Sequence, residues 1–351
     1  MIAPTLKHNP VRADWLALHQ EAPVDPDLPI VDAHHHLYHR PPDHKYLFDE
    51  YLADLNCGHN IRATVYVQAR AMLRADGAPA MRPVGETEFA NGMAAMSASG
   101  LYGDVAMCAA IVGYADLRLG DAVRPVLESH IAAAGGAGCP DGRFRGIRQG
   151  LAWDADPSFM NSAYAVTEDM MDGAAFRRGF ECLSRAGLSF DAWLFFHQIP
   201  RLTALARAYP DTPIVLNHCG GILGVGRYAD SAPQVYDRWK TAMSELALCP
   251  NVMVKLGGLG MRMSGFGFEQ DAVPPSSDRL AQAWRPWVNH CAEAFGTDRI
   301  MFESNFPVDK GSYAYGVGLN AMKKLFTDCS NDEKADVFWR SASRFYRLPP
   351  F

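Results

Sequence analysis

The stretch Pro29–His36, which reads PIVDAHHH, says most about the fold of this chain and its chemistry. An apolar Ile-Val pair leads into an aspartate and two histidines at alternate positions. Alternate residues of a β-strand point to the same side, so a strand here places Asp32, His34 and His36 on one face and turns His35 to the other. An aspartate and two imidazoles gathered at the end of a strand suit a metal site or a proton-transfer site better than a core.

Eight segments have the composition of β-strands, since they are rich in β-branched or aromatic residues and flanked by Gly, Pro, Asn or Asp. They are Ile30–His34, Ala63–Gln68, Val105–Val112, Arg145–Leu151, Phe190–Phe196, Ile214–Asn217, Val252–Leu256 and Ile300–Glu303. Segments with helical spacing of apolar residues lie between them, and they stop at glycine or proline. These are Glu86–Ser99, Ala122–Ala134, Ala174–Ala186, Ile199–Tyr209, Val235–Cys249 and Trp284–Phe295. The alternation implies a parallel sheet, and eight such units predict an α/β fold of the (β/α)8 TIM barrel type.

The segments outside this alternation divide the chain further. Residues 1–29 precede the first strand and are predicted to form an N-terminal arm, and residues 30–351 are predicted to form one barrel domain. Two long loops follow the second and seventh strands, Ala69–Glu86 and Gly257–Ser277. Barrel active sites lie at the C-terminal ends of the strands, so we expect these loops to wall the substrate pocket.

Composition limits the classes of partner. The 351 residues are 48% hydrophobic and 21% charged, with a net charge of −6 and no basic block, which argues against nucleic acid. No apolar stretch is long enough to cross a membrane, and the N-terminus lacks the apolar core of a signal peptide. The eight cysteines form no C-x-x-C pair, which indicates reduced thiols in a cytoplasmic protein. We expect a homo-oligomer, since dimers are common for such folds.

Polar residues recur where the predicted strands end, and the barrel brings such ends together at one mouth. They are Gln68 and Arg70, Arg148, His197, His218, Lys255, and Glu303 with Asn305. The guanidinium of Arg148 suits a carboxylate. Lys255 lies within an apolar strand and therefore needs an anionic partner, which is either a strand carboxylate such as Glu303 or a substrate carboxylate.

Five motifs together resemble the amidohydrolase superfamily, in the branch of amidohydrolase-related proteins. They are VDAHHHLY at Val31–Tyr38, RGIRQ at Arg145–Gln149, PIVLNHCGG at Pro213–Gly221, NVMVKLGGLGM at Asn251–Met261 and RIMFESNFPVD at Arg299–Asp309. This branch includes 2-pyrone-4,6-dicarboxylate lactonase, sugar-acid lactonases and metal-dependent decarboxylases. The resemblance implies a barrel hydrolase with its site at the C-terminal ends of the strands.

The resemblance also implies a ligand set for one divalent ion, zinc or manganese. Metal-dependent members hold it with histidines of the first and sixth strands and an aspartate of the eighth, which here correspond to His34, His36 and His218, with Asn305 in the aspartate's place. Related lactonases read GSDWPV where this chain reads ESNFPV. Three outcomes stay open: a metal-free site, a metal site completed by Asp32 or Glu303, or impaired hydrolytic chemistry.

The leading hypothesis is hydrolysis of a lactone or related cyclic ester of a carboxylated small molecule. It assigns catalysis to His34, His36, His218, Asn305 and Asp309, and substrate binding to Gln68, Arg70, Arg148, His197 and Lys255. Asn305 leaves the general base open between His197, Asp32 and Asp309. The alternatives are a metal-dependent decarboxylase and a barrel that binds a ligand without turnover.

Overall fold

Eight parallel strands form a single sheet in the computed structural model, which describes residues 8–41, 44–136, 142–161 and 163–351. In sheet order the strands are β1 (Ile30–His35), β4 (Ile61–Val67), β5 (Ala106–Gly113), β6 (Phe144–Gly150), β7 (Ser189–Trp193), β8 (Ile214–Leu216), β9 (Val252–Leu256) and β10 (Ile300–Phe302). Each coincides with one of the eight strands predicted from the sequence. The fold is a (β/α)8 TIM barrel, as predicted.

The sheet is closed by residues that directly follow β10. His35 and Phe306 form a parallel bridge. The backbone N–H of Asn305 donates to the carbonyl of His34 over 2.9 Å, and that of His36 donates to the carbonyl of Phe306 over 2.8 Å. Closure therefore ties the histidine segment of β1 to the segment that carries Asn305.

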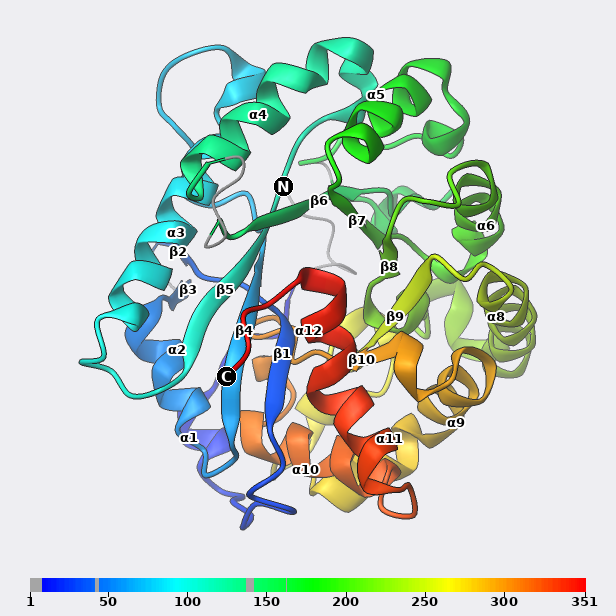
Figure 1. Cartoon of the computed structure of the whole chain (residues 1–351). Helices are drawn as coiled ribbons and strands as arrows, with labels where there is room; N and C mark the ends of the chain where they lie inside the picture. Colours follow the sequence, from blue (N-terminus) through cyan, green and yellow to red (C-terminus); the bar gives the residue numbers. More distant parts are fainter. Residues whose placement is uncertain (1–7, 42–43, 137–141, 162) are drawn as a thin grey trace.

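Helices surround the strands (Figure 1). Their bounds are α1 Ala13–Leu16, α2 Phe48–Leu55, α3 Val84–Ala98, α4 Arg124–Ala133, α5 Ala174–Arg185, α6 Ile199–Ala208, α7 His218–Gly221, α8 Ala232–Ala247, α9 Ser277–Phe295, α10 Tyr315–Leu325, α11 Asn331–Ala335 and α12 Ser341–Tyr346. The six predicted helices are present, whereas α10 was missed because two glycines weaken its helical signal. Among the described residues, no helix combines the length and apolar composition that a bilayer crossing requires.

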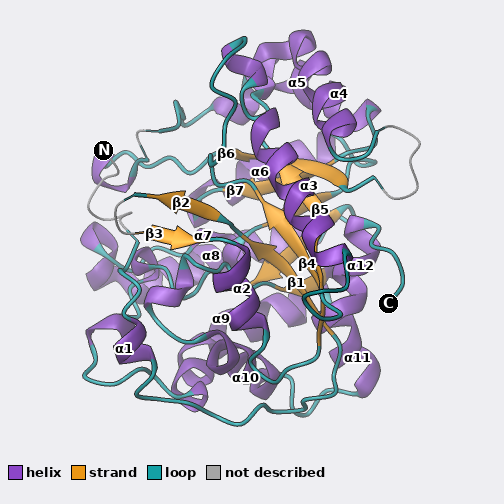
Figure 2. Ribbon diagram, turned by 90° about the vertical axis from the view of Figure 1, so that its left-hand side faces the viewer, coloured by secondary structure: helices purple, strands orange, loops and turns teal. Residues whose placement is uncertain are grey.

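The two ends of the barrel carry different elements. Figure 2 shows the hairpin of β2 (Tyr38–Arg40) and β3 (His44–Tyr46) at one end and α12 at the other. The described part of the N-terminal segment lies along the loop after β9, since Arg12 donates to the carbonyl of Glu269 over 2.6 Å and Trp15 to that of Asp271 over 3.0 Å.

A buried ion pair lies inside the barrel. Lys255 Nζ lies 2.7 Å from Asp191 Oδ2, and both side chains are fully buried. The hydroxyl of Tyr346, in α12, donates to the same carboxylate over 2.9 Å, and Lys255 lies 5.1 Å from the centre of the Tyr346 ring. The last helix thus completes the polar interior of the barrel.

This pair corrects two predictions for Lys255. It neither pairs with Glu303 nor lines the cavity where a substrate would bind. In the sheet, Lys255 is level with Met301, two residues before Glu303. It therefore lies one layer deeper, where Asp191 of β7 is its partner.

We expect Lys255→Met to lower the free energy of unfolding by about 3–5 kcal/mol, because it leaves the Asp191 carboxylate buried without a cation. Urea denaturation measures this loss. The double variant Lys255→Met/Asp191→Asn removes both charges and should recover part of it. Strictly additive losses in the two single variants would contradict a coupled pair.

Candidate active site

A β-bulge in β1 decides which of its side chains face inward. Asp32 pairs with Thr64 of β4, and the next pair joins His35 to Tyr66. Three steps along β1 therefore match two along β4, so β1 contains one extra residue. The bulge shifts the alternation of sides between Asp32 and His34.

Asp32 consequently lies among hydroxyl groups, away from the cavity. Its carboxylate accepts hydrogen bonds from Ser304 Oγ (2.6 Å), Tyr51 (2.7 Å) and Tyr315 (3.0 Å). Burial raises the pKa of Asp32 above its usual value. The prediction that Asp32 shares a face with His34 and His36 is therefore wrong. Because Asp32 does not reach the cavity, its predicted roles as metal ligand and as general base are wrong too.

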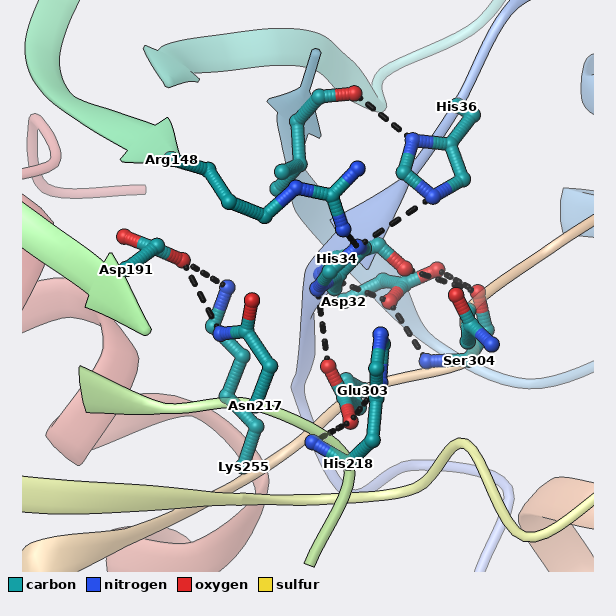
Figure 3. Close-up of polar contacts among 12 residues, drawn as sticks. Asp32, His34, His36, Arg148, Asp191, Asn217, His218, Lys255, Glu303 and Ser304 are labelled. Atoms are coloured by element: carbon teal, nitrogen blue, oxygen red, sulfur yellow. Dashed lines mark hydrogen bonds and ion pairs between the residues drawn. The ribbon is translucent and has the colours of Figure 1, made fainter. Parts of the chain in front are cut away.

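Glu303, directly after β10, lies between two histidines (Figure 3). One oxygen, Oε1, is 2.7 Å from His218 Nδ1 and also accepts the backbone N–H of His218 over 2.8 Å. The other, Oε2, is 2.9 Å from His34 Nδ1, without the alignment of a hydrogen bond. His218 fits closely against Gly258, where a Cβ would meet His218 Cβ at 2.4 Å.

The partners of the three histidines fix their tautomers. Arg148 Nη1 lies 3.1 Å from His34 Nε2, and because a guanidinium only donates, this nitrogen must accept. The His34 proton is therefore on Nδ1, which faces Glu303. His36 Nδ1 donates to the carbonyl of Val67 over 2.7 Å, and His218 Nδ1 donates to Glu303. Burial lowers the pKa of all three imidazoles, so they are neutral with their lone pairs on Nε2.

These groups border a cavity of about 360 Å³ at the C-terminal ends of the strands. Its lining residues are His8, His36, Tyr38, Arg40, Ala69, Arg70, Arg148, Gly150, Ala152, Asn161, Ala163, Tyr164, Val166, Trp193, Phe195, His218, Met261, Met263, Asn305 and Val308. Of the predicted site residues, the cavity brings together His36, Arg70, Arg148, His218 and Asn305. His34 lies directly beneath them, under Arg148.

Gln68 supports this floor and does not line the cavity. Its Nε2 donates to the carbonyl of Arg148 over 3.2 Å, and Arg148 Nη2 donates to the carbonyl of Gln68. The side chain of Arg148 is thereby held between β4 and the imidazoles. Burial lowers the pKa of Arg148, but an arginine keeps its charge at neutral pH.

Two further arginines lie at the rim, and each is stacked on a tyrosine. Arg40 lies 4.3 Å from the ring centre of Tyr38 and donates to the carbonyl of Ala69 over 2.7 Å. Arg70 lies 4.9 Å from the ring centre of Tyr164 and donates to the carbonyl of Ala163. Stacking orients the guanidinium groups and leaves other N–H donors free for a ligand.

Asn305 and Asp309 form a pair in which only Asn305 reaches the cavity. Asn305 Nδ2 donates to Asp309 Oδ1 over 2.8 Å, and Asp309 Oδ2 accepts from Gly260 N and Tyr313, each over 2.8 Å. Burial raises the pKa of Asp309 to about 7. The structure places Asp309 behind Asn305, which contradicts its predicted contact with the reacting water.

His197 is also outside the cavity lining, so the prediction that it binds substrate is wrong. Its Nε2 lies 3.1 Å from Asp154 Oδ2, and Asp154 is held in turn by Arg227 and Tyr228. His197 follows β7 by several residues and belongs to the turn that leads into α6, where Asp154 holds its ring.

Sequence reasoning missed one wall of the cavity. The connection 151–173 after β6 contributes Ala152, Asn161, Ala163, Tyr164 and Val166. Its length was the available signal, because a stretch of more than about 15 residues without a helix or strand is usually functional. The two loops predicted to wall the pocket do so, through Ala69 and Arg70 and through Met261 and Met263.

The residue types suit a divalent ion, because His34, His218 and Glu303 offer one ligand atom each within 4.8 Å of one another. The charges around these three residues do not suit a divalent ion. The Arg148 guanidinium covers the lone pair of His34, both oxygens of Glu303 face imidazole N–H groups, and neutral Asn305 stands at the eighth strand. As arranged here, the site presents a fixed monocation where an ion would be held.

Comparison with known proteins places these features in a family context. Residues 31–348 match the family model described as Amidohydrolase. The uncharacterized protein y4mH of Sinorhizobium fredii is 30% identical over 92% of this chain and 99% of its own length. An L-fucono-1,5-lactonase of Burkholderia ambifaria is 30% identical over 68% of this chain and 71% of its own. The crystal structure of an amidohydrolase from Burkholderia multivorans with bound zinc has the same fold, with a TM-score of 0.68, 24% identity, and coverage of 91% of this chain and 99% of that one.

The raised pKa of Asp309 predicts a pH-dependent stability. Between about pH 4 and about pH 7 the native state keeps a proton that the unfolded state has released, so the free energy of unfolding falls as pH rises, by roughly 1 kcal/mol per pH unit. We expect Asp309→Asn to lack this contribution, so its unfolding free energy should depend less on pH across this range. Urea denaturation at several pH values tests this, and parallel curves for the two proteins would contradict it.

Proposed function

The chain belongs to the amidohydrolase family, and from this we propose that it hydrolyses the lactone ring of a small carboxylated molecule to the open hydroxy acid. The enzyme is a hydrolase, and its lactonase relatives support a cyclic ester as the bond that is cut. The site geometry supports the remaining parts of the proposal.

The charge of the cavity is the observation that carries the choice of substrate. The lining holds three arginines and, among the described residues, no aspartate or glutamate, although the whole chain has a net charge of −6. A cavity of this kind attracts and retains an anion. Arg40 and Arg70 at the rim offer donors for a carboxylate, while the apolar side chains of Trp193, Met261 and Met263 face the carbon skeleton.

We assign the general base to His218. Its Nε2 lone pair borders the cavity, and Glu303 fixes the opposite side of the ring over 2.7 Å. In the proposed reaction, His218 takes a proton from water as the oxygen attacks the lactone carbonyl, and Glu303 stabilises the imidazolium that forms. His218 then returns the proton to the ring oxygen as the carbon–oxygen bond breaks.

Arg148 is the donor for the negative charge that develops on the carbonyl oxygen. The neutral imidazoles present lone pairs to the cavity and cannot donate there, whereas Arg148 has five N–H groups and keeps some free beyond its bonds to His34 and Gln68. This role differs from the sequence-based hypothesis, which assigned Arg148 to substrate binding. A preorganised charged donor of this kind contributes roughly 3–4 kcal/mol to the stabilisation of a transition state.

We expect His218→Ala to lower kcat by about 10²–10⁴-fold, because it removes the base and leaves only the binding contacts. Steady-state hydrolysis of the best substrate from a panel of lactones, followed as acid release, measures it. His197→Ala is the matched control, since this histidine is held by Asp154 outside the cavity, and it should stay close to the wild type. Equal rates for His218→Ala and the wild type would contradict the assignment.

The rim arginines predict a charge-dependent KM. We expect Arg40→Gln/Arg70→Gln to raise KM for a carboxylated lactone by about tenfold or more and to change KM for a neutral lactone little, because each charge-assisted hydrogen bond contributes about 1.5–3 kcal/mol. The two substrates serve as each other's control. Equal increases would show that the arginines act on cavity shape and not on substrate charge.

The same panel of lactones also tests the alternative reaction, decarboxylation. Carbon dioxide release from a carboxylated substrate, without hydrolysis of any lactone, would replace the proposal by a decarboxylase. Lactone opening without carbon dioxide release supports it.

A further inference from the structure

We propose that the guanidinium of Arg148 takes the place of a divalent cation at the imidazole cluster, so that Arg148 keeps the cluster free of metal and its removal creates a zinc site. The cluster consists of His34, His36 and His218. The inference concerns which cation the cluster holds, and it does not depend on the identity of the substrate.

The imidazole lone pairs of the cluster favour a cation beside them. His34 Nε2 and His36 Nε2 are 3.3 Å apart. His34 Nε2 accepts from Arg148, which leaves the His34 proton on Nδ1, and His36 Nδ1 donates to the carbonyl of Val67. Neither Nε2 can donate to the other, so two lone pairs face each other in a buried place. Such an arrangement requires a positive charge beside it. Arg148 Nη1, 3.1 Å from His34 Nε2, provides that charge.

The opposite sides of the three rings face partners that are typical of metal-binding histidines. Histidines that bind a metal generally donate their remaining N–H to a carboxylate or a backbone carbonyl, which orients the ring and raises its basicity. Here Nδ1 of His34 and of His218 face Glu303, and Nδ1 of His36 donates to the carbonyl of Val67. The surroundings of the cluster are therefore those of metal ligands, although an arginine lies on the ligand side.

The charges around the cluster balance without a divalent ion. Glu303 is the carboxylate that contacts the cluster, and the residue two positions later, which lines the cavity, is the neutral Asn305. One negative charge balances one guanidinium. A divalent ion bound beside Arg148 would add two positive charges without an additional carboxylate, which is unfavourable in a buried site. Loss of the guanidinium removes this repulsion and exposes the lone pair of His34.

Two further carboxylates, those of Asp309 and Asp32, do not change this charge balance. Asp309 is behind Asn305, and its oxygens are occupied by Asn305, Gly260 and Tyr313. Asp32 is turned outward by the β-bulge. Arg148 is therefore the residue that decides whether the cluster is metal-free.

The test measures binding of zinc alone. Wild type, Arg148→Met and Arg70→Met are stripped with a chelator, incubated with zinc, and separated by gel filtration. Elemental analysis then gives zinc per chain, and competition with a chromophoric chelator gives Kd. Arg70→Met is the matched control, because it loses the same charge at the rim, away from the imidazoles. Arg148→Met/His34→Ala asks whether the gained site uses the cluster.

We expect Arg148→Met to bind one zinc per chain with a Kd at least tenfold lower than that of the wild type or Arg70→Met, and His34→Ala to abolish this gain. Equal affinity in wild type and Arg148→Met would overturn the proposal, as would a gained site that survives the loss of His34. If Arg148→Met does not fold by circular dichroism, Arg148→Gln keeps a polar partner for the Gln68 carbonyl, and the same criteria apply. This experiment does not measure lactone hydrolysis. A negative result would therefore overturn the proposal on zinc binding without bearing on the proposed reaction.

Discussion

The contact of Glu303 with His34 and His218 is the interaction on which the site depends. It joins the ends of β1, β8 and β10, which are far apart in the sequence, through a single buried carboxylate. Glu303 accepts the Nδ1 proton of His218, and Arg148 donates to His34 Nε2, so both imidazoles carry their protons on the side that faces Glu303 and their lone pairs on Nε2. The tautomers of His34 and His218, the choice of His218 as general base, and the preference of the cluster for a guanidinium over a metal ion depend on this arrangement.

The sequence predicted the barrel well because strand composition and glycine or proline stops recur eight times, and these signals are local. It also indicated several of the strand ends that border the cavity. It failed for Asp32 and Lys255 because both depend on sheet register. One extra residue in β1 turns Asp32 outward. Lys255 lies one layer deeper in the barrel than Glu303 and therefore pairs with Asp191. Neither register is visible in composition or periodicity.

Asn305 shows a different limit of sequence reasoning. Its replacement of an aspartate suggested a missing base, and nearby carboxylates were candidates to take over. In the structure, the carboxylate of Asp309 serves to hold the Asn305 amide, and the histidine paired with Glu303 is left facing the cavity. A substitution at one strand end is therefore interpretable only together with the residue behind it, which a local motif does not identify.

The position of Tyr346 has a consequence for how the chain folds during synthesis. This residue belongs to α12, near the C-terminus, yet its hydroxyl bonds the interior carboxylate of Asp191. All eight strands precede Tyr346 in the chain, so they leave the ribosome before this hydroxyl is available to Asp191. The polar interior of the barrel is therefore completed only when α12 has docked.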